Sequence, residues 1–256
     1  MTTKIGVIGD IHANLPALEA VLSDARARGV SALWDVGDAV GYGAFPDEVV
    51  SRLRAEGVVS IVGNYDQRVL ECAGGTAHVP RQIQKRLALQ WACARLSARN
   101  RGYLRTLLPE LRMEVEGRRV LMVHGSPSSP KEHLSPDTPR ERLRELAAAA
   151  GAEVVLCGHS HRPFARKEGG TWFINPGSVG RPDDGDPRAS YCVLYLNPRF
   201  VRARLLRVAY DVEREARALT DHSLPTVFAD MTRRGRSLDA ILEAAGHSSG
   251  NRCSSC

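Results

Sequence analysis

Short apolar runs recur along the chain, and segments with helical periodicity separate the earlier ones. The strand-like runs cover residues 4–9, 32–36, 58–62, 120–123, 154–157, 172–174, 191–196 and 201–208. The helical patterns cover residues 17–27, 47–55, 83–96 and 140–150. Because continuous apolar strands alternate with helices, the pattern predicts a layered α/β fold around a mixed sheet.

The later part of the chain changes in character. Short turns such as Glu168-Gly169-Gly170 join the later strands, which predicts antiparallel additions to the sheet. Residues 79–108 are helical without a strand, and we expect them to form a helical cap between the third and fourth core strands. The pattern therefore predicts one domain over residues 1–210, an Arg-rich helical extension over 211–245 and a frayed tail over 246–256.

The candidate chemistry lies where the apolar runs end. Five of them are followed by a small residue and a side chain able to bind a metal ion. These side chains belong to Asp10, His12, Asp38, Asn64, His124, His159 and His161. Since ligands bind beyond the carboxyl ends of strands in open α/β sheets, we expect these side chains to meet at one edge.

The donor types narrow the choice of metal ion. The set mixes imidazole, carboxylate and one amide without a thiolate, which favours Mn, Fe, Co, Ni or Zn over Ca. Seven donors exceed what one such ion with an open position uses. They suit two neighbouring ions, an arrangement that clamps the attacking and leaving oxygens in phosphoryl transfer.

Composition adds a bias toward anions and sets the expected compartment. The 256 residues are 43% hydrophobic with a formal net charge of +6, and only four of the 35 basic residues are lysine. Arginine suits bidentate contact with phosphate, although a solvated surface is the plainer explanation. The sequence has no long apolar run, and residues 1–4 lead directly into a strand, so we expect a soluble cytoplasmic protein.

The cysteines do not suggest a second site. Cys157 and Cys192 fall inside apolar runs, as reduced core thiols do. Cys253 and Cys256 form an isolated pair in the predicted tail, where neither a redox nor a zinc role has visible partners.

The ordered motifs GDIHAN, GDAVGYG, GNYD, VHGSP, GHSHRP and NPGSVG resemble the calcineurin-like metallophosphoesterase superfamily, in particular its small prokaryotic phosphodiesterases from bacteria and archaea. The resemblance implies a double β-sheet sandwich flanked by helices, with a dinuclear site. It implies that a metal-bridging hydroxide attacks phosphorus in line, with Mn the expected metal and Fe, Ni, Co or Zn as alternatives.

The resemblance also distributes the ligands between the two ions. One ion would be held by Asp10, His12 and His161, and the other by Asn64, His124 and His159, with Asp38 as the bridge. On this basis Asp38, Asn64 and His124 are the expected catalytic residues.

One position departs from the family pattern. Many members have a histidine after the GN pair, thought to protonate the leaving group, and here that residue is Tyr65. A tyrosine hydroxyl with a pKa near ~10 is a poor proton donor at neutral pH. We therefore expect a preference for esters with good leaving groups, such as aryl or anhydride-linked diesters.

Two further residues are candidate substrate contacts beside Tyr65. Asn175 follows a strand in a Pro-Gly turn that either shapes the substrate pocket or only ends the strand. Arg188, in the segment Asp183 to Arg188, either contacts a phosphate or pairs with acids of its own turn.

Several functions remain open from the sequence. The first is a phosphodiesterase acting on a phosphorylated small molecule or a nucleotide; a phosphomonoesterase acting on a phosphoprotein or nucleotide is the alternative. A non-catalytic interaction scaffold is opposed by the complete ligand set. A nuclease is possible through Arg199, Arg202, Arg204 and Arg207, but aromatic content is only 5% and no stacking platform is visible. A homo-oligomer is possible.

Overall fold

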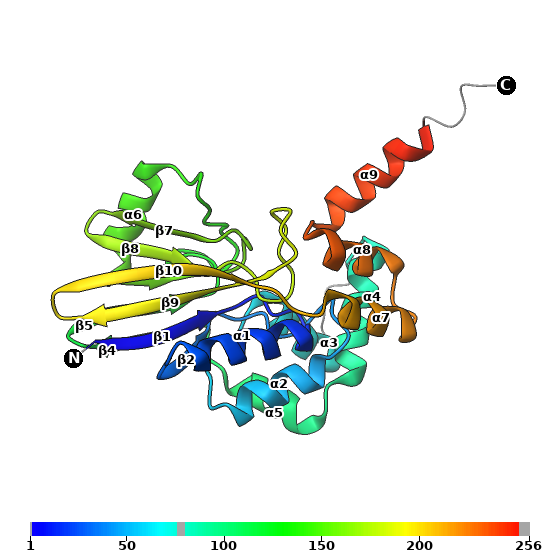
Figure 1. Cartoon of the computed structure of the whole chain (residues 1–256), viewed down its shortest axis with the longest axis horizontal. Coiled ribbons are helices and arrows are strands. Elements are labelled where there is room, and N and C mark those ends of the chain that lie inside the picture. The colour runs from blue at the N-terminus through cyan, green and yellow to red at the C-terminus, as the bar shows by residue number, and fades with distance from the viewer. Residues whose placement is uncertain (1, 76–79, 251–256) are drawn as a thin grey trace.

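The computed structural model describes residues 2–75 and 80–250, with side chains to residue 245. Two five-stranded sheets stack face to face, and helices lie outside them (Figure 1). The predicted α/β double-sheet sandwich is therefore confirmed. The single mixed sheet suggested by periodicity alone is wrong, because the strands divide between two sheets.

The first sheet has the strand order β10-β9-β1-β2-β3. Its strands are β1 (Thr3–Ile8), β2 (Ala32–Asp35), β3 (Val59–Ser60), β9 (Ala189–Asn197) and β10 (Phe200–Val208). The first three run parallel, whereas β9 pairs antiparallel with both β1 and β10. The parallel part brings the carboxyl ends of β1, β2 and β3 to the same edge.

The second sheet has the order β4-β5-β6-β8-β7. Its strands are β4 (Glu110–Val115), β5 (Arg118–Val123), β6 (Val154–Leu156), β7 (Phe164–Glu168) and β8 (Thr171–Asn175). Strands β5, β6 and β8 are parallel, and β7 and β8 form an antiparallel pair across the turn at Glu168-Gly169-Gly170.

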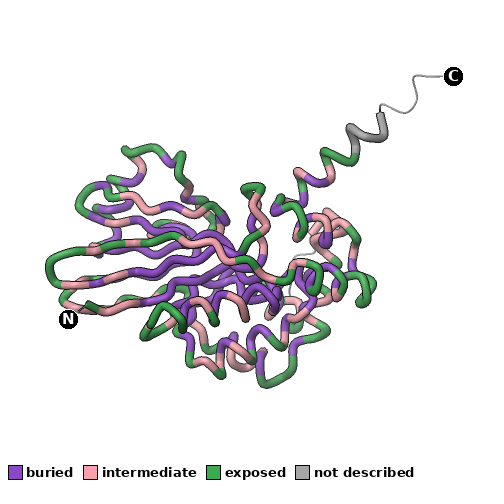
Figure 2. The backbone as a smooth tube through the Cα atoms, viewed as in Figure 1, coloured by how far each residue is buried: buried purple, intermediate pink, exposed green. Residues whose placement is uncertain are grey.

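The alternation of side chains along the strands builds separate apolar layers. In β5, Val120 and Met122 face the other sheet, where they join Ile5 and Val7 of β1. The intervening Leu121 packs instead in the layer under α6 (Arg140–Ala150). On the opposite side, α1 (Leu15–Ala27) and α2 (Pro46–Ala55) cover the first sheet. Figure 2 shows the buried backbone concentrated in these strands.

Helices gather at the end of the sandwich where the parallel strands terminate. They are α3 (Asn64–Ala73), α4 (Ile83–Arg95), α7 (Val212–Asp221), α8 (Thr226–Arg234) and α9 (Leu238–Gly250), whereas α5 (Ala98–Thr106) packs beside α2. Tyr42 and Tyr65 share one apolar cluster with Ala88 of α4, Leu219 of α7 and Phe228 of α8. The C-terminal extension therefore packs against the loops at the strand ends, and α9 projects from the body (Figure 1).

The differences from the predicted elements have a local cause. Strands β4 and β7 were not predicted, and β4 alternates between half-buried and exposed residues, three of them charged, as an edge strand does. Helix α3 was also missed, because it begins at the candidate ligand Asn64 directly after a two-residue strand. The predicted tail over 246–256 overlaps the end of α9, and its cysteine pair lies outside the described residues. No helix of the described ranges is long and apolar enough to cross a membrane.

Candidate metal centre

The loops after β1, β2, β3, β5 and β6 meet at one end of the sandwich and bring all seven predicted ligands together. Five of these residues are at most 5% exposed: Asp10, His12, Asp38, His124 and His161. Asn64 and His159 are half-buried and line the open side of the same place. The ligands come from both sheets, so the site lies where two sheet edges face each other rather than along one edge.

An unusual backbone conformation marks these loops. Five of the seven candidate ligands have φ between 47° and 66°, namely Asp10, His12, Asp38, His159 and His161. Such left-handed conformations cost about 1–3 kcal/mol each for residues other than glycine, and they cluster at functional sites. Hydrogen bonds between the loops hold them: Asp10 N donates to Gly37 O at 2.9 Å, and His12 N to Asp38 O at 2.9 Å.

Asp10, His12 and His161 form the first donor group. Asp10 Oδ1 is buried without a hydrogen-bond partner in the described structure, and it lies 3.4 Å from His161 Nε2. The Nε2 atoms of His12 and His161 face each other at 3.1 Å. Both rings direct Nδ1 at a backbone carbonyl oxygen, His161 at 2.7 Å and His12 at 3.3 Å, which leaves Nε2 to act as a ligand.

The electrostatics of this group agree with a cation site. Burial, followed by the neighbouring His161, lowers the pKa of His12 to about 3, so its ring is neutral at physiological pH. Burial opposes the charge of Asp10, but His161 and the other histidines hold its pKa below the ordinary value. The neutral His12 imidazole beside an ionised, unpartnered carboxylate fits a divalent metal ion.

His124 is the centre of the second donor group. Its Nδ1 lies 2.8 Å from Val36 O, while its Nε2 lies 3.0 Å from Asn64 Oδ1 and 3.5 Å from Asp38 Oδ2. Because both ring nitrogens face oxygens, the ring needs two protons unless a cation replaces one. Burial disfavours that charge, but Asp38 and Asp10 raise the pKa of His124 to about 10 in the metal-free chain.

Asp38 lies between the two donor groups. Its Oδ2 is 3.5 Å from His124 Nε2 and 3.9 Å from His12 Nε2, which are members of different groups. Its Oδ1 accepts a hydrogen bond from Tyr65 N at 2.7 Å, which fixes the carboxylate. His159 completes the second group, and its ring centroid lies 5.0 Å from that of His124. These residues fit two cations with Asp38 placed to contact both.

Asp66 supports the site from behind, a role that the sequence did not reveal. Its Oδ2 accepts from Asp38 N at 3.0 Å and Gly63 N at 2.9 Å, and its Oδ1 accepts from Val40 N at 3.1 Å. Burial and the nearby Asp38 raise the pKa of Asp66 to about 6. One carboxylate therefore joins the loop after β2 to the start of α3.

Tyr65 faces the cavity in front of the donors, but its hydroxyl is already engaged. Tyr65 Oη donates to Tyr42 Oη at 2.6 Å, and the two rings lie 5.0 Å apart. Burial, followed by the neighbouring Tyr42, raises the pKa of Tyr65 above its ordinary value. The phenol is therefore a weaker proton donor here than in water.

The other two candidate substrate contacts do not reach this cavity. Asn175 is fully buried, and its Nδ2 donates to Gly158 O at 2.8 Å and to Ser160 Oγ at 3.0 Å. It thereby holds the loop that carries His159. Arg188 pairs with Asp186 at 2.6 Å at the surface.

Residues that the sequence did not single out as ligands or contacts complete the cavity. Its wall includes Tyr42, Arg68, Lys85, His133 and Arg181. The ring of His133 packs against that of His159, with 4.0 Å between the ring centroids. Arg181 gave no signal in the sequence beyond its place directly after the NPGSVG segment.

Comparisons with known proteins agree with this geometry. The sequence profile described as the calcineurin-like phosphoesterase superfamily domain matches residues 3–199. An uncharacterized protein of Methanocaldococcus jannaschii is 32% identical over 251 residues, covering 91% of this chain and 99% of its own. Phosphodiesterase YfcE of Escherichia coli is 27% identical, covering 75% of this chain and 86% of its own.

A solved structure shares both sequence and fold. The metallophosphoesterase of Sphaerobacter thermophilus is 31% identical, with a TM-score of 0.77, and the match covers 92% of this chain and all of that one. The match extends beyond residue 199, so the similarity includes part of the C-terminal extension.

Proposed function

The chain belongs to the calcineurin-like phosphoesterase superfamily, and from that premise we propose that it is a phosphodiesterase that uses two divalent metal ions. Family membership supports phosphoester hydrolysis in general, and the similarity to the phosphodiesterase YfcE favours diesters. The ion pair, the diester preference and Mn as the metal are parts of the proposal.

The observation that carries the proposal is the unpartnered Asp10 Oδ1, which is buried among imidazole nitrogens. A buried carboxylate oxygen without a partner is costly, and a bound cation removes that cost. Asp10, His12 and His161 would hold one ion, and Asn64, His124 and His159 the other, with Asp38 contacting both. Bound divalent ions supply Lewis acidity toward phosphoryl oxygens and acidify water.

The protein residues prepare the site for that chemistry. The backbone carbonyls of Val40, Val36 and Arg181 fix the rings of His12, His124 and His161, so Nε2 of each ring faces the interior. Asp66 and Asn175 hold the ligand-bearing loops in place. Such fixed donors need little reorganisation during the reaction, which is the main source of electrostatic catalysis.

The preference for diesters with good leaving groups rests on Tyr65. Its proton is committed to Tyr42, and its raised pKa makes transfer to a departing alkoxide less favourable. A leaving group of low basicity, such as a phenolate or a phosphate, departs without that proton.

The test uses protein stripped with a chelator and assayed on bis(p-nitrophenyl) phosphate and on p-nitrophenyl phosphate. We expect activity to return with Mn²⁺ and to be higher on the diester. His161→Ala should lose the response, whereas His222→Ala, a histidine packed on Trp91 away from the donors, should keep it. Equal activity with and without metal would show that the site is not a metal centre.

A further inference from the structure

Arg181 holds its charge at the cavity without a carboxylate partner. Its guanidinium carbon lies 4.2 Å from the ring centroid of Tyr42, and its Nε is buried without a hydrogen-bond partner. No ion pair involves Arg181 within residues 2–75 and 80–250, although most buried charges in proteins are paired. The side chain is therefore a cation with unused donors.

The backbone of Arg181 is fixed to the metal centre. Its carbonyl oxygen accepts from His161 Nδ1 at 2.7 Å, and its N–H donates to Ser178 Oγ at 2.7 Å. The preceding Gly180 packs so closely that an added Cβ would lie 1.8 Å from Ile11 O. The backbone of Arg181 is thus held rigidly beside the metal ligands, and the Tyr42 ring supports its guanidinium.

A second arginine occupies the matching position on the other tyrosine. The guanidinium carbon of Arg68 lies 5.5 Å from the ring centroid of Tyr65, and Tyr65 is hydrogen-bonded to Tyr42. Both guanidinium groups line the same cavity as Asp38 and Asn64. The four side chains Arg181, Tyr42, Tyr65 and Arg68 form one wall, which we call the Arg–Tyr wall.

The charges around the Arg–Tyr wall decide which ligand it suits. Beyond the candidate metal ligands, Asp239 is the only acid that lines this cavity in the described part of the chain. Its Oδ2 lies 3.9 Å from Lys85 Nζ, so its charge is offset by that lysine. Two cations would neutralise one phosphoryl group at the metal centre. Among the described residues, no carboxylate forms an ion pair with Arg181 or Arg68. Both guanidiniums are therefore additional positive charge, and their planar donors match phosphate oxygens.

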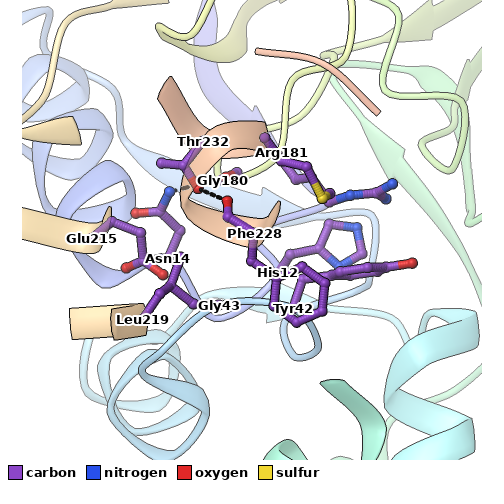
Figure 3. A pocket seen from close by; sticks show the side chains of 11 residues that line it. His12, Asn14, Tyr42, Gly43, Gly180, Arg181, Glu215, Leu219, Phe228 and Thr232 are labelled. Carbon is purple, nitrogen blue, oxygen red and sulfur yellow. Dashed lines mark hydrogen bonds between the residues drawn. The ribbon is translucent and has the colours of Figure 1, made fainter. Parts of the chain in front are cut away.

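Figure 3 shows the direction of Arg181 in the adjoining cavity. Glu215 and Asn14 lie at one end, whereas the guanidinium of Arg181 extends in the same direction as the Tyr42 ring, toward the other end. The buried Glu215 is therefore separated from the charge of Arg181 and does not neutralise it.

We propose that the Arg–Tyr wall binds a second anionic group of the substrate, so that the natural substrate is a phosphodiester or phosphoanhydride carrying another phosphate. This inference rests on the proposed phosphodiesterase function and adds the substrate class. Arg181 and Arg68 would each donate hydrogen bonds to the second phosphate. Charge-assisted hydrogen bonds of this kind change affinity by about tenfold or more each.

The test compares two chromogenic diesters with the same reacting phosphate and leaving group. One is thymidine 5′-(p-nitrophenyl phosphate). The other is the same compound with an additional phosphate on the 3′-hydroxyl. We expect the wild-type protein to favour the second substrate in kcat/KM by at least about tenfold, mainly through KM. Arg181→Gln and Arg68→Gln should each reduce that ratio toward one, whereas Arg26→Gln, a paired surface arginine, should not.

Two kinetic outcomes would overturn the inference. An unchanged ratio in both cavity variants would show that the Arg–Tyr wall does not touch the second phosphate. An equal fall on both substrates would place Arg181 on the reacting phosphate instead. Melting curves of each variant identify a folding defect, and Arg68→Gln provides an independent test at an exposed helix position.

A binding measurement separates this inference from the proposed function. Calorimetry with chelator-stripped protein and inorganic pyrophosphate needs no turnover and no metal. We expect wild-type protein and Arg26→Gln to bind pyrophosphate at least about tenfold more tightly than Arg181→Gln. Equal binding by all three would overturn the Arg–Tyr wall, even if hydrolysis is observed. If the stripped wild-type protein binds pyrophosphate more tightly than Arg181→Gln, but hydrolyses neither diester after Mn²⁺ is restored, the wall is supported and the proposed function is contradicted.

Discussion

The hydroxyl oxygens of Tyr65 and Tyr42 lie 2.6 Å apart, with Tyr65 as the donor. Tyr65 occupies the place where many members of the superfamily have a histidine, and its proton is already committed. We therefore predict that Tyr65→His raises kcat/KM on alkyl phosphate esters by at least about tenfold, because an imidazole can protonate a basic leaving group.

The matched variant for this prediction is Tyr65→Phe, which removes the hydroxyl and keeps the ring. It should change the hydrolysis of p-nitrophenyl esters by less than about threefold, since that leaving group needs no acid. If both variants leave the ratio of alkyl to aryl ester hydrolysis unchanged, Tyr65 has no part in the departure of the leaving group.

Asp66 stabilises the site because its carboxylate accepts hydrogen bonds from three backbone N–H groups. Asp66→Asn replaces one accepting oxygen with a donor, so we predict a loss of about 2 kcal/mol in the free energy of unfolding. For a chain of this size, the melting temperature should fall by roughly 4–8 °C.

The control for Asp66 is Asp137→Asn, whose side chain is 73% exposed and pairs with Arg162. That variant should change the melting temperature by less than about 2 °C, because exposed ion pairs contribute little. A melting temperature for Asp66→Asn equal to that of the control would contradict the role assigned to Asp66.

Glu215, in the C-terminal extension, makes the stability of the fold depend on pH. Its Oε1 accepts from Ala44 N at 2.9 Å, its Oε2 has no partner, and burial raises its pKa from 4.5 to about 8. The folded chain therefore holds a proton that the unfolded chain loses. The free energy of unfolding contributed by that proton is fully present below the unfolded pKa of 4.5. It decreases as the pH rises toward about 8, by at most about 1.4 kcal/mol per pH unit.

We predict that Glu215→Gln removes much of this decrease. Melting temperatures of chelator-treated wild-type and variant proteins should diverge between about pH 5 and about pH 8, with the variant more stable at the upper end. Glu48→Gln, at an exposed position of α2, should follow the wild type. Parallel curves for all three proteins would show that Glu215 is not buried as a neutral acid.

Much of the site could be predicted because its signals are local. Each candidate ligand lies just beyond the end of an apolar run and near a glycine, so sequence order alone marked Asp10, His124 and His161 as candidates. The left-handed backbone at Asp10 and His161 gave no such signal, because it depends on hydrogen bonds between different loops.

The remaining features depend on contacts between distant segments. Arg181 meets Tyr42 only after β8 and β2 bring their loops to the same end of the sandwich. Strand β4 pairs with β5 at a sheet edge, where half-exposed side chains blur the alternation that marks a strand. The sequence predicted the ligands, but not the wall of the cavity that faces them.

The central claim is that Asp38 lies between two cations. The most direct measurement is a titration of chelator-stripped protein with Mn²⁺, in which bound metal per chain and hydrolysis of bis(p-nitrophenyl) phosphate are followed together. The account predicts that full activity requires two ions per chain, and that Asp38→Asn binds fewer ions and loses at least about a hundredfold in kcat. Full activity at one ion per chain, or without metal, would contradict it.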